Sequence, residues 1–90
     1  MEARAAAERI AIAGLDFLGR DPERLDRFLR NTGLTIGELR QAAGEDGFLV
    51  GVLAHFLADD SLLMAFAADD DIDPETIASA HDVLSEPHVD

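Results

Sequence analysis

The chain carries a series of helix start signals, and they limit the fold more than any other feature does. Asp21 and Asp73 are each followed by a proline, which combines a capping side chain with a residue suited to the first helical turn. Thr35 and Glu38 have the spacing of a capping box. Apolar residues between these signals repeat with helical spacing, and no segment alternates as a half-buried strand does. The sequence therefore predicts an all-α fold.

The start signals divide the chain into a bundle of five or six helices within a single domain, 1–90. The first helix is expected over residues 2–18, with Gly19 as the left-handed residue that ends it, and residues 85–90 are expected to form a frayed tail. The later helices begin, in order, at Asp21, Thr35, Asp46, Asp60 or Ser61, and Asp73. The residues expected to face inward are Ala3, Ala6, Ile10, Ala13, Phe17, Ile12, Leu15, Leu25, Phe28, Leu29, Ile36, Leu39, Leu62, Leu63, Phe66, Ile77, Ala80 and Leu84. Close helix contacts are expected at Gly14, Gly37 and Gly51.

Residues 48–58 are expected at the centre of the bundle. Only His55 is polar in this stretch, and a helix that is apolar on every side belongs in the interior of a fold. Residues 48–68 together reach the length of a membrane span, but Asp59 and Asp60 lie at the middle, where two carboxylates would be very costly. The same pair favours a corner between two buried helices, and we expect no membrane insertion.

The two halves of the chain have similar patterns. At an offset of 38 residues, Phe28 aligns with Phe66, and the capping residue Thr35 aligns with the capping residue Asp73. The pattern suggests two pseudo-repeated three-helix units, each with a long, a medium and a short helix. Duplication of one unit and convergence of helical sequences explain this similarity equally well.

Several of the capping and apolar residues form a recognisable pattern. It consists of the run Phe17-Leu18-x-x-Asp21-Pro22-Glu23-Arg24-Leu25-x-x-Phe28-Leu29, then Thr32-Gly33-Leu34, then Phe48-Leu49-x-x-Val52-Leu53-x-x-Phe56-Leu57. This pattern resembles an uncharacterised family of short bacterial proteins catalogued only as a domain of unknown function. The resemblance covers nearly the whole chain and implies an all-helical domain. It implies no activity, cofactor or site residue.

The charges are distributed very unevenly. Residues 1–45 carry eight acidic residues and seven arginines, whereas residues 46–90 carry eleven acidic residues and no basic one. The halves have net charges of −1 and −11, which together give the −12 of the whole chain. A chain with this distribution presents one region that repels anions strongly, and this bears on its partners more than on its fold.

A helix-turn-helix over residues 24–43 is the most specific alternative. Two short helices joined by a glycine-containing turn could place one helix in a DNA groove. The side chains that could contact phosphates are Arg24, Arg27, Arg30 and Arg40. However, residues 20–40 contain five arginines and four acidic residues, so the segment is barely basic. The second half also keeps the same apolar spacing over residues 66–80 without a basic residue, which disfavours binding of nucleic acid.

The sequence contains no complete motif for a calcium site, a catalytic centre or a thiolate metal site. An EF-hand loop that starts at Asp69 would need glycine and glutamate where the chain has Pro74 and Ala80. His55 could act as a general base only beside a nucleophile or a carboxylate. The simpler interpretation is a histidine at a helix end that is held by a carbonyl group or by Asp59, one helical turn ahead. The chain has no cysteine, which excludes disulfides and thiolate metal sites.

The predicted function is that of a small, non-catalytic, acidic interaction domain. Its candidate surface for a basic protein partner consists of Asp59, Asp69, Asp70 and Asp71. A second copy of the chain is another candidate partner, and nucleic-acid binding through the arginines is the alternative function. No cofactor or metal is implied. A cytoplasmic location is expected because the first residues do not resemble an export signal.

Overall fold

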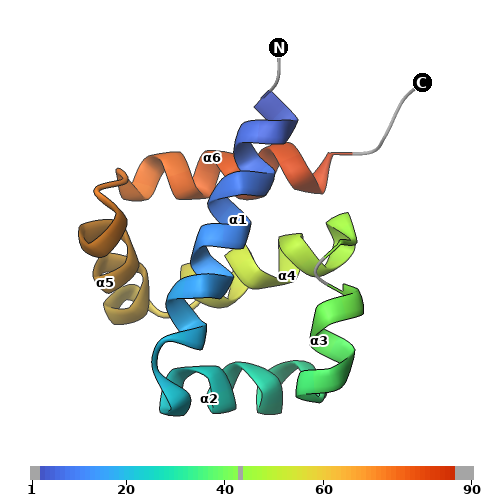
Figure 1. The fold of residues 1–90 in the computed structure, drawn as a ribbon. Coiled ribbons are helices and arrows are strands. Elements are labelled where there is room, and N and C mark those ends of the chain that lie inside the picture. The colour runs from blue at the N-terminus through green and yellow to red at the C-terminus, as the bar shows by residue number, and fades with distance from the viewer. Residues whose placement is uncertain (1–2, 43, 87–90) are drawn as a thin grey trace.

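The computed structural model describes residues 3–42 and 44–86, and over these residues the chain forms six helices and no strand. The helices are α1 (Ala3–Gly19), α2 (Pro22–Thr32), α3 (Ile36–Ala42), α4 (Asp46–Leu57), α5 (Asp60–Asp70) and α6 (Pro74–Ser85). Figure 1 shows α1 crossing α4 and α6, with α5 at one edge and α2 and α3 on the other sides. The predicted all-α bundle is confirmed. Helix α6 includes Ser85, and residues 87–90 of the predicted tail lie outside the described residues.

Both Asp-Pro signals start helices in the predicted way. The Asp21 carboxylate accepts a hydrogen bond from the backbone N–H of Glu23 at 3.0 Å. The Asp73 carboxylate accepts one from the backbone N–H of Glu75 at 3.1 Å. These bonds satisfy amide groups that have no partner within their own helix. The two starts therefore depend on local chemistry that the sequence contains in full.

The capping box is confirmed, whereas one predicted helix end is wrong. The N–H of Thr35 donates to Glu38 Oε1 at 2.9 Å, and the N–H of Glu38 donates to Thr35 Oγ1 at 3.2 Å. Gly33 ends α2 in the left-handed conformation with φ 77°. Gly19 does not adopt this conformation. Instead, the N–H groups of Arg20 and Asp21 donate hydrogen bonds to the carbonyl groups three residues earlier in α1, and these bonds close the turn.

Helix α4 occupies the centre of the fold, as predicted. It packs against α1, α5 and α6, and its buried residues are Leu49, Val52, Leu53 and Phe56. The Phe56 ring lies 4.7 Å from the Phe66 ring of α5, measured between centroids, and 6.0 Å from the Phe17 ring of α1. Tilted ring pairs at these distances add to the stabilisation that burial of their apolar area provides. These three rings join α1, α4 and α5.

Helix α1 buries its predicted face only in part: Phe17 is buried, and Ile10, Ala13 and Leu15 pack against the core from partly buried positions. Its buried residues are Ala7, Ala11, Gly14, Phe17 and Leu18. Four of them lie along one side of the helix, where small side chains allow α6 and α4 to approach closely. Ile12, which was predicted to face inward, is 50% exposed, and Ala3 is also exposed. The prediction followed the larger aliphatic residues, whereas the closest helix contacts use alanine and glycine.

Helix α3 contributes little to the core. None of its residues is buried, and Ile36, predicted to face inward, is 62% exposed. Leu39 packs against the core from a partly buried position. Ile36 is the first residue of a seven-residue helix, so a single apolar contact one turn later is enough to place it.

The predicted long, medium and short helices do not recur in the second half. Helices α1 to α3 have 17, 11 and 7 residues, whereas α4 to α6 have 12, 11 and 12. Helix α6 also buries Ile77, Ala80 and Leu84, while α3 buries nothing. Phe28 and Phe66, which align at the offset of 38, are both fully buried. Duplication therefore stays a hypothesis that rests on the aromatic pair and the caps.

One of the three glycines predicted at helix contacts is at such a contact. A Cβ atom on Gly14 would lie 2.9 Å from Cε2 of Phe56 and 3.4 Å from Cε2 of Phe66. No atom comes within 4 Å of such a Cβ on Gly51, and Gly37 meets only its neighbour Thr35 at 3.9 Å. The predictions for Gly37 and Gly51 are therefore wrong.

We expect alanine to have opposite effects at Gly14 and Gly51. In Gly14→Ala the new methyl group must displace packed rings, and overpacking of this kind costs about 1–3 kcal/mol, more than the gain in helix propensity. In Gly51→Ala the space is open, and the change should raise the free energy of unfolding by about 0.5–1 kcal/mol. Urea denaturation of both variants measures this difference. A more stable Gly14→Ala would show that the rings do not pack against this glycine.

Candidate interaction surface

The N-terminal end of α5 is fixed by one of the predicted surface residues. Asp59 accepts a hydrogen bond from the backbone N–H of Leu62 at 3.2 Å, so it acts as the cap of α5. The axes of α4 and α5 meet at 107° around this residue. The predicted corner is confirmed, and the Asp59 carboxylate is engaged in forming it.

The C-terminal end of α5 carries the other predicted acidic residues. Asp71 ends the helix with φ 54°, the left-handed conformation, and its N–H donates to the carbonyl of Ala67. Aspartate tolerates this conformation better than most residues because its short polar side chain can bond locally. Asp71 is exposed. Asp59 therefore lies at one end of α5 and Asp69, Asp70 and Asp71 at the other, so the four residues do not form one cluster.

Arg20 ties this acidic end to α1. Its Nη2 atom lies 3.1 Å from Asp69 Oδ2 and 3.8 Å from Asp70 Oδ1, while its Nε atom lies 3.4 Å from Asp16 Oδ2. One guanidinium thus faces three carboxylates and links the C-terminal ends of α1 and α5. Exposed ion pairs of this kind contribute little energy each, but they fix the position of the side chains they join.

The pKa of Asp70 is raised despite the nearby arginine. Partial burial of the carboxyl group is the largest cause, followed by the hydrogen bond with Asp69 and the negative charge of that neighbour, while Arg20 acts in the opposite direction. Two adjacent carboxylates that share one cation cannot both be fully stabilised as anions. The acidic end of α5 therefore carries more negative charge than Arg20 balances.

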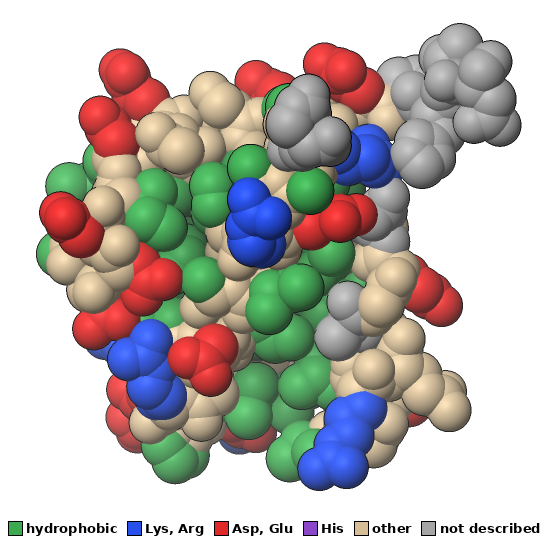
Figure 2. Space-filling view, turned by 45° about the horizontal axis from the view of Figure 1, so that its top comes forward, with side chains coloured by type: hydrophobic (Ala, Val, Ile, Leu, Met, Phe, Trp, Pro, Cys, Tyr) green, Lys and Arg blue, Asp and Glu red, His purple; other side chains and the backbone are tan. Residues whose placement is uncertain are grey.

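Further acidic residues continue from α5 onto α6. We define the α5–α6 acidic surface as Asp69, Asp70, Asp71, Asp73 and Glu75 between the two helices, together with Asp60 at the opposite end of α5. Asp60, Asp71 and Glu75 are exposed, and none of them forms an ion pair with another described residue. Figure 2 shows carboxylates along the edge of the molecule formed by α5 and α6. This surface presents charge that the fold itself does not neutralise.

The arginines proposed for DNA contacts are partly engaged within the protein. Arg24 lies 4.8 Å from the centre of the Phe17 ring and 3.6 Å from Asp21, while Arg30 pairs with Asp26 at 2.9 Å. Arg27 and Arg40 are exposed and pair with no acidic side chain of the described residues. Helices α2 and α3 share few contacts, and α3 has no buried residue that would hold it across α2. The packing of a helix-turn-helix is therefore not present in residues 24–42, the described part of this segment.

His55 lies beside a polar hollow but does not line it. The hollow has a volume of about 210 Å³ and is lined by Arg24, Arg27, Asp59, Ser61 and Leu62. The His55 ring packs edge-on against Phe28 with 5.1 Å between centroids, and it forms no hydrogen bond with another described residue. The predicted contact with Asp59 is therefore absent from the described structure. The pKa of His55 is lowered, mainly by burial and also by Arg27, while Asp59 opposes this shift.

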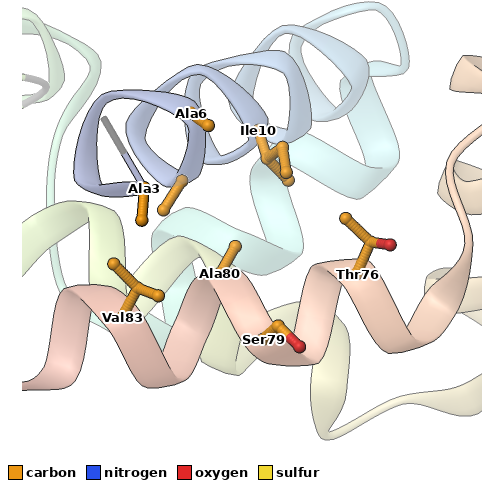
Figure 3. A pocket seen from close by; sticks show the side chains of 8 residues that line it. Ala3, Ala6, Ile10, Thr76, Ser79, Ala80 and Val83 are labelled. Atoms are coloured by element: carbon orange, nitrogen blue, oxygen red, sulfur yellow. The ribbon is translucent and has the colours of Figure 1, made fainter. Parts of the chain in front are cut away.

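A second hollow lies between α1 and α6 and is apolar. It measures about 150 Å³, and Figure 3 shows Ala3, Ala6 and Ile10 of α1 facing Thr76, Ala80 and Val83 of α6. Ser79 lies at its edge. The lining includes no charged side chain, so this hollow offers no group for acid–base chemistry.

Two further findings bear on the sequence-based hypotheses. Among the described residues, no three histidine, aspartate or glutamate side chains are placed to hold a metal ion. Likewise, no single helix in the described part of the chain has the length and apolar character of a membrane span. The bent pair of residues 47–57 and 60–70 meets those criteria only when its two helices are taken together.

Two residues on and beside α5 were not predicted from the sequence to lie at this surface. Arg20 was not singled out, although its spacing of four residues from Asp16 could have indicated an ion pair; its contacts with α5 depend on the tertiary fold. Met64 is 56% exposed on α5. The signal for Met64 was the run of seven apolar residues at 62–68, which is long for a helix that has one face toward solvent.

Over its described residues, the fold defines a small six-helix all-α domain. The model of the family described as protein of unknown function (DUF3572) matches residues 4–87, and the chain belongs to this family. This confirms the resemblance to a domain of unknown function. A search of curated proteins and a search of solved structures gave no match.

We expect His55 to make the protein less stable at mildly acidic pH. Because its pKa is lowered in the folded state, protons bind the unfolded chain more tightly, and stability is lost as the pH falls below about 6.5, the ordinary histidine pKa. Urea denaturation at several pH values between neutrality and pH 5 should show this loss in the wild type and a smaller one in His55→Gln. The variant His81→Gln serves as control. Equal losses in wild type and His55→Gln would contradict the partly buried position of the ring.

Proposed function

We propose that this protein is a non-catalytic interaction domain that binds a basic partner protein through the α5–α6 acidic surface. The observation that carries the proposal is the set of exposed carboxylates at Asp60, Asp71 and Glu75, which no described cation balances. Caps at Asp59, Asp71 and Asp73 hold this surface in a defined shape. A fixed array of like charges recognises a complementary array better than a flexible acidic segment does, because less freedom is lost on binding.

The charge of the whole chain supports the same proposal. Residues 46–90 carry a net charge of −11, and Arg20 is the cation from the first half that pairs with α5 among the described residues. A surface of this kind accelerates encounters with a basic partner and repels acidic ones. The proposal includes a cytoplasmic location, since a fold without cysteine does not depend on an oxidising compartment.

Replacing the unpaired carboxylates with amides should abolish binding of the basic partner protein. The variant Asp60→Asn/Asp71→Asn/Glu75→Gln should retain far less protein than the wild type when both are immobilised and exposed to an extract of the source cell. Proteins held by the wild type should elute as salt rises toward about 1 M, where the Debye length falls to about 3 Å. The control variant Glu23→Gln/Asp26→Asn/Glu45→Gln makes the same change in net charge in the first half of the chain and should behave as the wild type.

Two results would contradict the proposal. The first is equal retention by the surface variant and the control, because binding would then not depend on these carboxylates. The second is a salt-dependent shift of duplex DNA by the wild type that is lost in Arg27→Ala/Arg30→Ala. That result would favour a nucleic-acid interface on α2 instead.

A further inference from the structure

The outer face of α5 is unusually apolar for a surface helix. Residues 62–68 are all apolar, but only Phe66 and Ala67 are buried. Met64 is 56% exposed and Ala68 is also exposed, while Ala65 is partly buried. A helix that packs on one side only normally carries polar residues on its other side. In α5 they are missing from the middle of the outer face.

The position of α5 explains why this matters. Helix α4 is also rich in apolar residues, but it lies at the centre, where α1, α5 and α6 pack against it and only Gly47 and Ala54 are exposed among its residues 47–57. Helix α5 lies at the edge of the molecule in Figure 1, and its described contacts are with α1, α4 and α6 on the inner side. On the outer side Met64 and Ala68 remain exposed, while Ala65 is partly buried against the core. We define the α5 outer face as Ser61, Met64, Ala65 and Ala68.

Carboxylates mark both ends of this face. Asp60 lies at its start, and Asp69 and Asp71 lie at its end; eleven residues of helix correspond to about 16 Å between the two ends. In Figure 2, hydrophobic side chains reach the surface on the α5 side between carboxylates. The pattern along α5 is therefore negative, apolar and negative again.

This pattern determines which occupant fits. If α5 packed against α5 of a second copy, either orientation would place acidic ends against acidic ends, and like charges in contact are unfavourable. An anionic lipid surface would be repelled for the same reason. A helix with apolar side chains in its middle and arginine or lysine at both ends complements the negative start, the apolar middle and the negative end of the α5 outer face. Small residues beside Met64 allow a helix to approach closely, and the flexible thioether adapts to what it meets.

We infer that the α5 outer face is the docking site for an amphipathic helix of the partner, with Met64 as the apolar anchor and basic side chains on the carboxylates at both ends. This inference rests on the proposed function and specifies the partner segment as an apolar helix with basic residues at both ends. The acidic residues guide the encounter, while contact with Met64 provides the part of the affinity that salt does not remove.

The chain offers a direct probe of this contact because it contains only two methionines, Met1 and Met64. A protein labelled with carbon-13 at the methionine methyl groups should therefore give two resonances, and Met64→Gln assigns them. The probe is a synthetic helical peptide with a leucine stripe and two arginines at each end, about 16 Å apart. We expect the Met64 resonance to shift as peptide is added, whereas the Met1 resonance stays in place.

Matched variants separate the anchor from the charges. Met64→Gln should weaken peptide binding at least about tenfold, as expected for an anchor at the centre of an interface. Ile36→Gln makes the same kind of change at another exposed apolar residue and should leave the dissociation constant within about twofold of the wild type, a difference of roughly 0.4 kcal/mol. A peptide with glutamate in place of arginine should not bind.

Four results would overturn the inference. If the arginine peptide does not bind, Met64 is not an anchor. If the peptide binds Met64→Gln as tightly as the wild type, Met64 is again not an anchor, but the acidic surface still binds and the proposed function survives. If vesicles of phosphatidylglycerol and phosphatidylcholine in equal amounts broaden the Met64 resonance while the peptide does not shift it, the face binds lipid. If sedimentation shows a dimer that Met64→Gln dissociates, the occupant is a second copy.

Discussion

The contact of the Phe17, Phe56 and Phe66 rings beneath Gly14 joins three helices, and most of the remaining structure depends on it. The missing side chain at Gly14 leaves room for the edge of the Phe56 ring. That ring places α4 across α1, and its neighbour Phe66 places α5 against both. Helix α5 is anchored by Phe66 and Ala67, with Leu62, Leu63 and Ala65 packed against the core from partly buried positions. These contacts determine which side of α5 faces the core and which side remains at the surface.

The sequence predicted those parts of the fold that depend on neighbouring residues. Both Asp-Pro starts and the capping box could be read directly, because the bonds that form them join residues two or three positions apart. The apolar character of α4 also predicted its central place. The buried face of α1 could not be predicted in the same way, since Ala7 and Ala11 are buried only because α6 approaches closely. Hydrophobic size favours Ile12, but helix separation decides the outcome.

The candidate surface was predictable only in part. The excess of acid in the second half is a property of composition, and it indicated a charged surface without showing its extent. Whether the carboxylate of Asp69 is free depends on a tertiary contact, because Arg20 reaches it across a separation of 49 residues. The carboxylate of Asp59, by contrast, is engaged locally by the N–H of Leu62 in the helix that it caps. The exposure of Met64 likewise required the placement of α5, because the apolar run that contains it looks the same whether it is buried or not.

The link through Arg20 makes the placement of α5 sensitive to ions. Arg20 follows the last residue of α1 and approaches the last residues of α5, where the aligned peptide dipoles of each helix concentrate partial negative charge. One guanidinium thus compensates two helix termini as well as the acidic side chains around them. Added electrolyte weakens this compensation and the attraction of a cationic ligand together. The ionic-strength dependence of any complex formed at α5 will therefore report on the seating of the helix in its own domain as well as on the bound molecule.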